Sequence, residues 1–236
     1  MKNVIGFIPS RSGSKRLKDK NIKLLNNKPL IAYTIEAAKQ SKKLSRIICS
    51  TNSKIHADIA QSFGAEVPFL RPEELAVDKT SDREVLLHFI NWVKENEKTT
   101  PDYIVLLRPT TPFKNGELID NCISAIEDSD FSSIRTVTKV AGVFHPYWMY
   151  KKEDKRLEPF IKGIEISKYY QSQMLPTCYR LNGVVDILKT ENIIRSENMY
   201  GNNIGSIEVE AEKTVDIDDL SDFKFAEFLL KESLIK

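Results

Sequence analysis

The first half of the chain alternates short apolar runs with longer stretches in which apolar residues recur every three or four positions. Short runs bounded by polar residues are typical of buried strands, whereas the longer spacing is typical of helices. The runs predict strands over residues 3–8, 45–51, 65–70 and 102–107. The helical spacing predicts helices over residues 28–41, 53–64, 81–96 and 116–128. Pro29 fits the first position of its helix, and Gly64 fits a C-terminal cap.

This alternation predicts an α/β fold, doubly wound, with a mostly parallel sheet and helices on both faces. Strand patterning returns at residues 182–188 and 205–210, and an amphipathic helix is predicted over residues 219–234. No linker rich in Pro, Gly and Ser divides the chain, so one domain is expected over residues 1–236. Ligands of such sheets bind beyond the carboxyl ends of the strands, where chemistry is therefore expected.

Residues 141–176 break this rhythm and carry many aromatic side chains and charged turns. No regular alternation of helix and strand survives there, so we expect a small β-rich flap or arm inserted into the domain. Aromatic residues such as Tyr147, Trp148 and Tyr150 would suit self-association of this arm.

The 236 residues include 35 Lys and Arg against 33 Asp and Glu, which gives a net charge of +2. This balance argues against nucleic acid as a partner, so any anion site must be local. Three widely spaced cysteines without CxxC pairs predict reduced thiols and a cytoplasmic location, with neither a disulfide framework nor a zinc site. No apolar run approaches the length that crosses a membrane, so no membrane partner is expected.

A basic loop, IPSRSGSKRLKDKN at residues 8–21, follows the first predicted strand. Small residues around Gly13 allow the backbone N–H groups to converge on an anion. Arg11, Lys15 and Lys20 add positive charge that suits a triphosphate. The alternative is a solvated basic surface, but the position directly after a buried strand favours phosphate binding. The glycine spacing matches neither a P-loop nor a dinucleotide-binding fingerprint.

A pair of carboxylates, Asp216 and Asp218 in VDIDD, lies near the C-terminus. On a strand, residues two apart face the same side. Two hard oxygen ligands suit Mg²⁺, which binds through one or two carboxylates plus substrate phosphates. The alternative is a turn in which Asp218 or Asp219 caps the following helix. Combined with a triphosphate loop, the pair predicts a Mg²⁺ or Mn²⁺ site.

Two further loops carry an arginine just after a predicted strand. Arg71 precedes Pro72, which restricts it to an extended or turn conformation. The following residues 80–82 predict a helix cap whose hydroxyls could also contact a nucleobase. Arg108 lies in LLRPTTPF, where the alternative to a ligand contact is a rigid connection between strand and helix.

Taken in order, these stretches resemble the acylneuraminate cytidylyltransferase family, the CMP-sialic acid synthetases and their relatives. The basic loop matches I-P-A-R-x-x-S-K followed by K-N, and GAEVPFLRPEELAVDKTSD is a close match. Three further family motifs have counterparts in this chain. LLRPTTPF takes the place of L-Q-P-T-S-P, RLNGVVDI that of R-P-N-G-A-x-Y-I, and VDIDDLSDFKFAE that of the I-D-I-D-T ending. The resemblance covers essentially the whole chain.

The resemblance implies a sheet of the nucleotide-diphospho-sugar transferase type, a homodimer, and transfer of CMP from CTP to the anomeric hydroxyl of a small acidic sugar. That sugar would be a nine-carbon 2-keto-3-deoxy acid, and pyrophosphate would be released. The implied catalytic residues are Arg11, Lys15, Lys20 and Asp216, and the implied metal ligands are Asp216 and Asp218. The implied nucleotide-binding residues are Ser10, Arg11, Ser14, Lys15, Lys20, Asn21, Arg71, Thr80 and Ser81. The implied sugar-binding residues are Arg108, Ser172, Gln173, Arg180, Asn182 and Asp186.

Three positions depart from the family pattern, all on the sugar side by analogy. The family's Gln in L-Q-P-T-S-P is Arg108, its Arg in P-R-Q-Q-L-P is Ser172, and its Tyr in N-G-A-x-Y is Asp186. One hypothesis is that Arg108 pairs with the substrate carboxylate in place of the missing arginine. Because the nucleotide pattern is kept more fully than the sugar pattern, a nonulosonic acid other than ordinary sialic acid, such as a legionaminic-type sugar, is a reasonable substrate.

Two other functions stay open on the residues alone. A nucleotidyltransferase acting on a sugar 1-phosphate usually carries a G-G-x-G-[ST]-R loop, of which only Gly13 is present. A regulatory module that binds nucleotide without turnover is disfavoured by the retention of both Asp216 and Asp218.

Overall fold

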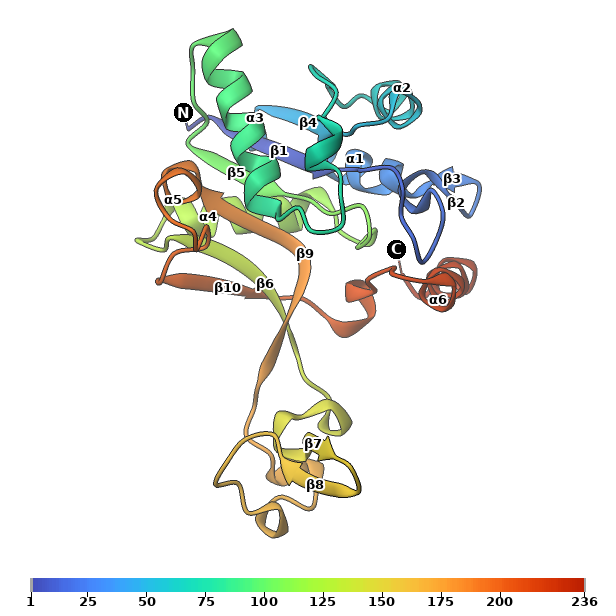
Figure 1. The fold of residues 1–236 in the computed structure, drawn as a ribbon, viewed down its shortest axis with the longest axis vertical. Helices are drawn as coiled ribbons and strands as arrows, with labels where there is room; N and C mark the ends of the chain where they lie inside the picture. The colour runs from blue at the N-terminus through green and yellow to red at the C-terminus, as the bar shows by residue number, and fades with distance from the viewer. Residues whose placement is uncertain (1, 236) are drawn as a thin grey trace.

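The computed structural model describes residues 2–235, and its centre is a six-stranded sheet in the order β10-β6-β9-β5-β1-β4 (Figure 1). The strands are β1 (Val4–Pro9), β4 (Arg46–Ser50), β5 (Tyr103–Leu106), β6 (Ser133–Lys139), β9 (Tyr179–Lys189) and β10 (Ile204–Glu208). Strand β1 pairs in parallel with β4 and β5, and β6 pairs in parallel with β10. Within this six-stranded sheet, β9 alone runs antiparallel to its neighbours, which are β5 on one side and β6 on the other.

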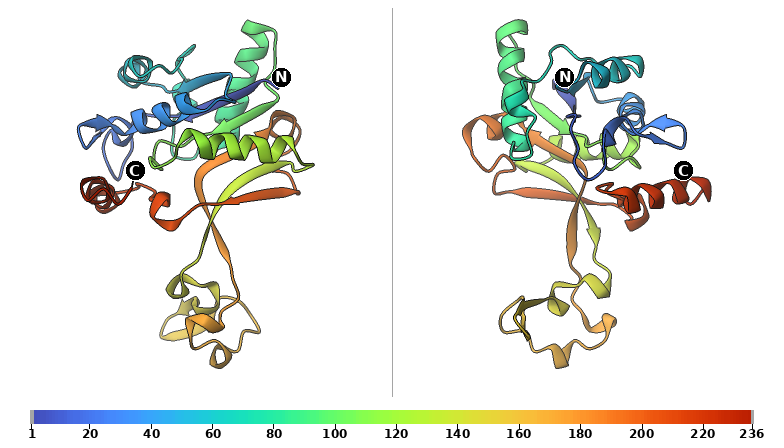
Figure 2. Two further views of the ribbon diagram at one scale, coloured as in Figure 1. Left: turned by 180° about the vertical axis from the view of Figure 1, so that it is seen from behind. Right: turned by 45° about the vertical axis from the view of Figure 1, so that its right-hand side comes forward.

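Helices cover both faces of this sheet (Figures 1 and 2). They are α1 (Leu30–Gln40), α2 (Lys54–Ser62), α3 (Asp82–Glu97), α4 (Gly116–Glu127) and α5 (Thr190–Arg195). Helix α6 (Leu220–Lys231) lies to one side of the sheet and packs against Leu17, Leu25 and Leu30. Alternate residues of β5 face two separate cores: Val105 packs with α1, α2 and α4, and Ile104 packs with α3 and α5. The predicted doubly wound, mostly parallel fold is confirmed.

Two local expectations are wrong, and prolines explain both. The segment 65–70 forms no strand but only two isolated bridges, since Pro68 lacks the N–H that a continuous ladder needs. Pro29 lies just before α1, where it belongs to a small hairpin of β2 (Leu24–Leu25) and β3 (Lys28–Pro29). Gly64 follows α2 with φ of 100°, which agrees with its expected role at the helix end.

An arm extends from the body where β6 and β9 continue beyond the sheet (Figure 1, yellow). It contains a hairpin of β7 (Tyr150–Glu153) and β8 (Arg156–Pro159), and the rest is mostly short 3₁₀ turns. Apolar side chains of the arm are exposed, among them Phe144 and Phe160 at 67% and 57%. Its expected use in self-association stays a prediction.

All three cysteines are free, as expected. Cys49 and Cys122 are buried, and burial raises the pKa of each thiol to about 12. None of the helices within residues 2–235 combines the length and the apolar character needed to cross a bilayer.

Candidate active site

The basic loop leaves the carboxyl end of β1 and closes with a 3₁₀ turn, η1 (Lys20–Ile22). Gly13 has φ of 78°, a left-handed conformation that glycine adopts without steric cost. Leu17 is buried in an apolar cluster with α6, whereas the side chains of Lys15 and Arg16 are 80% and 75% exposed. One apolar anchor thus fixes the loop while Lys15 and Arg16 face outward; the side chain of Lys20 is only 13% exposed.

Asp78 pairs with two cations of this loop. Its carboxylate lies 2.7 Å from Arg11 Nη2 and 2.5 Å from Lys15 Nζ, and the bonds from Lys15 and Arg11 lower the pKa of Asp78. Arg11 also donates from Nη1 to the carbonyl oxygen of Ala76 at 3.2 Å. The basic loop is therefore joined to the segment that precedes α3.

The acidic pair lies in an extended segment between η7 (Ala211–Thr214) and α6, outside the sheet. Ile217 is fully buried and donates its N–H to the carbonyl oxygen of Thr110 at 2.8 Å. Asp216 and Asp218 on either side of it are exposed, so they share one face of the segment as predicted. The segment also forms the turn that was the alternative to a metal site, because Asp219 caps α6.

Asp218 also pairs with two cations. It accepts a hydrogen bond from Lys20 Nζ at 3.0 Å and lies 3.6 Å from Arg16 Nη1. Within residues 2–235, no three His, Cys, Asp or Glu side chains are grouped so as to hold a metal ion. The two exposed carboxylates of Asp216 and Asp218 are hard oxygen ligands of the kind that Mg²⁺ takes together with phosphate oxygens and water.

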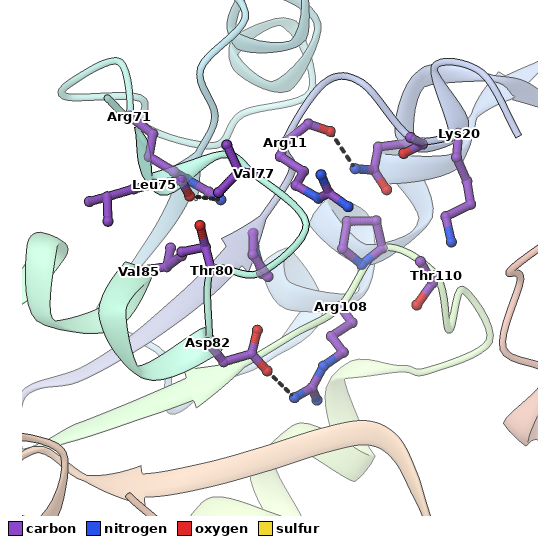
Figure 3. A pocket seen from close by; sticks show the side chains of 14 residues that line it. Arg11, Lys20, Arg71, Leu75, Val77, Thr80, Asp82, Val85, Arg108 and Thr110 are labelled. Atoms are coloured by element: carbon purple, nitrogen blue, oxygen red, sulfur yellow. Dashed lines mark hydrogen bonds and ion pairs between the residues drawn. The ribbon is translucent and has the colours of Figure 1, made fainter. Parts of the chain in front are cut away.

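Arg71 forms a second wall, across from Lys20 (Figure 3). It is 4% exposed and donates to the hydroxyl and carbonyl oxygens of Ser50 at 3.0 and 2.6 Å. Burial lowers the pKa of Arg71 to about 10. Thr80 lies on the same wall, and Ser81 caps α3 in a capping box with Glu84, which confirms the predicted cap.

These segments meet in one cavity of about 210 Å³ (Figure 3). The polar residues that line it are Arg11, Ser14, Lys20, Asn21, Arg71, Thr80, Asp82, Arg108 and Thr110. Lys15 and Asp218 line an adjoining pocket that shares Arg11 and Lys20 with the first. Loops that follow β1, β5 and the 65–70 segment thus converge at one edge of the sheet.

Two predicted nucleotide-binding residues lie behind this lining. The side chain of Ser10 is fully buried, and its hydroxyl lies 3.2 Å from Nδ1 of His56 on α2. Burial lowers the pKa of His56. Ser81 uses its hydroxyl to cap α3. Both residues support the walls in this structure, and their contact with nucleotide stays a prediction.

Arg108 belongs to a buried ion-pair network. Its guanidinium lies 2.8 Å from the fully buried carboxylate of Asp186 and 2.6 Å from that of Asp82. Arg135 binds the other oxygen of Asp186 at 3.1 Å and stacks 3.8 Å from the ring centre of Tyr200. Burial lowers the pKa of Arg108, but Asp186 and Asp82 outweigh that effect and raise the pKa above its ordinary value.

Two departures from the family pattern are therefore partners of each other. Arg108 and Asp186 lie 78 positions apart in the chain, yet they form one ion pair. Their pairing accounts for both substitutions without a substrate carboxylate. The hypothesis that Arg108 binds that carboxylate is untested, and the structure provides Arg108 with two carboxylates of its own.

The remaining predicted sugar-binding residues lie away from the cavity. Ser172 and Gln173 line a small pocket in the arm. Asn182 is buried in the sheet, where it bonds two threonine hydroxyls of β6 at 2.6 and 2.8 Å. Arg180 donates to Thr214 at 2.9 Å. None of these four lines the cavity within one chain, so their roles stay predictions.

Three charged residues of the site were not predicted from the sequence. Asp78 and Asp82 lie inside the AVDKTSD stretch, beside residues that were predicted. Lys114 follows the LLRPTTPF motif by one residue and is 6% exposed. Asp78 and Asp82 pair with residues that are distant in the sequence, and Lys114 binds backbone carbonyl groups. No spacing of residues along the chain therefore indicates these three site residues.

A cytidylyltransferase family profile matches residues 5–232. N-acylneuraminate cytidylyltransferase of Escherichia coli O18:K1:H7 is 32% identical over 223 residues, 94% of this chain, which spans about half (51%) of that relative. CMP-N,N'-diacetyllegionaminic acid synthase of Legionella pneumophila is 32% identical over 232 residues, 97% of this chain and 96% of that protein. The structure of CMP:2-keto-3-deoxy-manno-octonic acid synthetase complexed with CTP is similar with a TM-score of 0.74 at 16% identity, covering 98% of this chain and 100% of that one.

A cationic loop and an acidic pair at the carboxyl edge of a doubly wound sheet define a nucleotidyltransferase. The chain belongs to the cytidylyltransferase family. The resemblance to the acylneuraminate cytidylyltransferases is confirmed by the relatives that share a third of its residues over nearly its whole length.

Proposed function

We propose that this protein transfers CMP from CTP to the anomeric hydroxyl of a nine-carbon 2-keto-3-deoxy sugar acid and releases pyrophosphate. The observation that carries this proposal is the convergence of two separate loops on one cavity: the basic loop brings Arg11 and Lys20, and the loop after the 65–70 segment brings Arg71. The names of the two relatives described above support a sialic-acid-like or legionaminic-type substrate.

In this proposal the triphosphate binds to Arg11, Lys15 and Lys20. The structure pairs these cations with Asp78 and Asp218, whose side chains are 41% and 56% exposed. The ion pairs of Asp78 with Arg11 and Lys15 are exposed to solvent and contribute little to stability, so phosphate oxygens can replace this carboxylate at small cost. The cytidine would lie between Asn21, which follows Lys20 in the basic loop, and the opposite wall of Arg71 and Thr80, with Ser81 next to Thr80 at the start of α3.

The reaction is an in-line displacement at the α-phosphorus of CTP. The anomeric oxygen forms the new P–O bond while the bond to the pyrophosphate oxygen breaks, and pyrophosphate leaves with that electron pair. We assign the exposed carboxylate of Asp216 as the group that accepts the hydroxyl proton. Arg11 and Lys20 stabilise the charge that develops, so the protein contributes mainly positioning and electrostatics.

Asp216 and Asp218 would hold Mg²⁺ or Mn²⁺ together with phosphate oxygens. When bound, such an ion neutralises phosphate charge and lowers the pKa of a hydroxyl beside it. Lys20 would then exchange Asp218 for a phosphate oxygen, which its single ion pair in this structure allows.

A homodimer would complete the sugar side of the site. Ser172 and Gln173 lie in the arm and do not line the cavity of their own chain. The exposed apolar residues of the arm suit contact with a second copy; they include Val143, Phe144, Leu157, Phe160 and Tyr170. We therefore assign residues 141–176 as a dimerisation arm within a single nucleotidyltransferase domain.

Pyrophosphate release tests the reaction. The four nucleoside triphosphates are crossed with N-acetylneuraminic acid, a diacetyllegionaminic acid and a set of sugar 1-phosphates, with Mg²⁺ present. We expect release only with CTP and a 2-keto sugar acid. Release only with a sugar 1-phosphate would overturn the proposal, and no release from any pair would favour a regulatory module.

Substitution of Lys20 tests the site. We expect Lys20→Met to lower kcat/KM for CTP about 100-fold, because one group that stabilises the transition state is lost. Lys18→Met is the matched control, since Lys18 lies in the same loop, is exposed and lines neither pocket. Equal losses in both variants would show that only the net charge of the loop matters.

A further inference from the structure

Lys114 is a buried lysine directly beneath the loop that follows β5. Its side chain is packed between this loop and α1, and the residue is 6% exposed. Its ammonium donates to the carbonyl oxygen of Arg108 at 2.9 Å and to that of Thr111. The hydroxyls of Thr34 and Thr111 lie at 3.3 and 3.2 Å. A buried charge of this kind is costly and needs several partners, which these four oxygens provide.

Side chains complete the hydrogen bonds of this loop: the hydroxyls of Thr34 and Thr111 donate to the carbonyl oxygen of Arg108 at 3.4 and 3.2 Å, and Lys114 adds further donors. Pro109 and Pro112 have no backbone N–H, so the loop has fewer donors than acceptors. A buried carbonyl group without a partner costs free energy comparable to a lost hydrogen bond. The ammonium of Lys114 supplies up to three donors to this loop from a residue that follows it.

The loop held by Lys114 forms one wall of the cavity. Arg108, Pro109 and Thr110 all line the cavity. The carbonyl oxygen of Thr110 also accepts the N–H of Ile217 at 2.8 Å, which fixes the segment between the two exposed aspartates. Any shift of this loop therefore moves the cavity wall and the acidic pair together.

We infer that Lys114 is a positioning residue for the nucleotide site, acting through the 108–111 loop rather than by contact with substrate. The inference rests on the proposed nucleotide site. Burial and the nearby Arg108 lower the pKa of Lys114 to about 7, which agrees with an ammonium enclosed by protein atoms. Its role depends on the donors that it provides, so a side chain with equivalent donors should replace it.

The test compares Lys114→Met with Lys114→Arg in the full chain. Methionine keeps the volume and removes the donors, whereas arginine keeps a charge and several donors. We expect Lys114→Met to raise the KM for CTP at least tenfold and to lower kcat at saturating Mg²⁺ about as much. Lys114→Arg should stay within threefold of the original enzyme in both constants. Thermal unfolding shows whether each variant is folded.

Lys28→Met serves as the matched control. Lys28 pairs with Glu36 at 2.6 Å, lies over the ring of Tyr33 and lines no part of the cavity. The Lys28→Met variant also loses one lysine side chain to methionine, and its kinetic constants should stay within twofold of the original enzyme. A folded Lys114→Met enzyme with unchanged KM would overturn the inference. If Lys114→Met does not fold, a folded Lys114→Arg enzyme with a tenfold higher KM would overturn it, and one with normal constants would support it.

Arg71→Ala separates this inference from the proposed site itself. If CTP binding by calorimetry weakens in Arg71→Ala but is unchanged in Lys114→Met, the site is correct and the inference about Lys114 fails. If neither variant changes CTP binding, the assignment of the cavity to CTP fails.

Discussion

Two aspartates of this protein each hold two cationic side chains, but they do so in opposite surroundings. Asp78 lies 41% exposed between Arg11 and Lys15. Asp186 is fully buried between Arg108 and Arg135. Asp186 also accepts a hydrogen bond from the hydroxyl of Tyr200 at 3.3 Å, but the largest difference between the two sites is solvent access, so we expect burial to separate their roles.

Burial determines which charges a ligand can recruit. Water screens an exposed pair, and the pair exchanges one anion for another at small cost. A buried pair cannot be opened in this way, because either partner left alone would be a charge without solvation. Arg11 and Lys15 are therefore available to a triphosphate, whereas Asp186 holds Arg108 in place in the cavity wall.

The largest difference should appear in stability when Asp186 is changed. We expect Asp186→Asn to lower the free energy of unfolding by about 3 to 5 kcal/mol, because two guanidinium groups lose the buried carboxylate they share. Urea unfolding followed by fluorescence measures this. Adding Arg108→Gln to Asp186→Asn should cost less than the sum of the single changes, since both remove the same ion pair. Strict additivity would show that the two residues do not act as a unit.

The contrast between these two regions also marks the limit of what the sequence could predict. The position of Arg108 at the edge of the sheet was predictable, because it follows a strand that its own apolar run predicts, Tyr103–Leu106. The partner of Arg108 was not, because it depends on β9 running antiparallel beside β5. That strand order is a property of the whole fold, and no local spacing encodes it.

The strand predicted at 65–70 failed for a more local reason. Its apolar and polar pattern is that of a strand, but Pro68 removes one ladder donor. The segment still runs beside β4 through two bridges, and Arg71 at its end still reaches Ser50. Arg71 therefore lines the cavity although the segment that carries it forms no continuous strand, and its contact with nucleotide stays a prediction.

Lys114 provides a test of burial that depends on pH. Because burial lowers its pKa to about 7 from 10.5, the unfolded chain binds more protons than the folded chain between these pH values. The free energy of unfolding attributable to Lys114 should therefore rise with pH, by about 1 kcal/mol per unit above pH 7. The measurement is the stability of the original protein minus that of Lys114→Met across this range. NMR titration of lysine-labelled protein should show one midpoint near 7, and midpoints near 10.5 for every lysine would contradict the prediction.

The smallest effect is expected at the exposed aspartate. Asp78→Asn should leave the midpoint of urea unfolding unchanged, in contrast to Asp186→Asn, because solvent replaces the lost ion pairs. The same change should lower the KM for CTP by about two- to fivefold, since the carboxylate no longer competes with phosphate for Arg11 and Lys15. Lys15 and Arg11 lower the pKa of Asp78, so the competing carboxylate stays ionised at neutral pH. The gain should shrink at 1 M salt, where exposed charges are screened. A rise in KM would instead mean that Asp78 holds the loop in its binding conformation, and that exposed and buried aspartates differ less than their surroundings suggest.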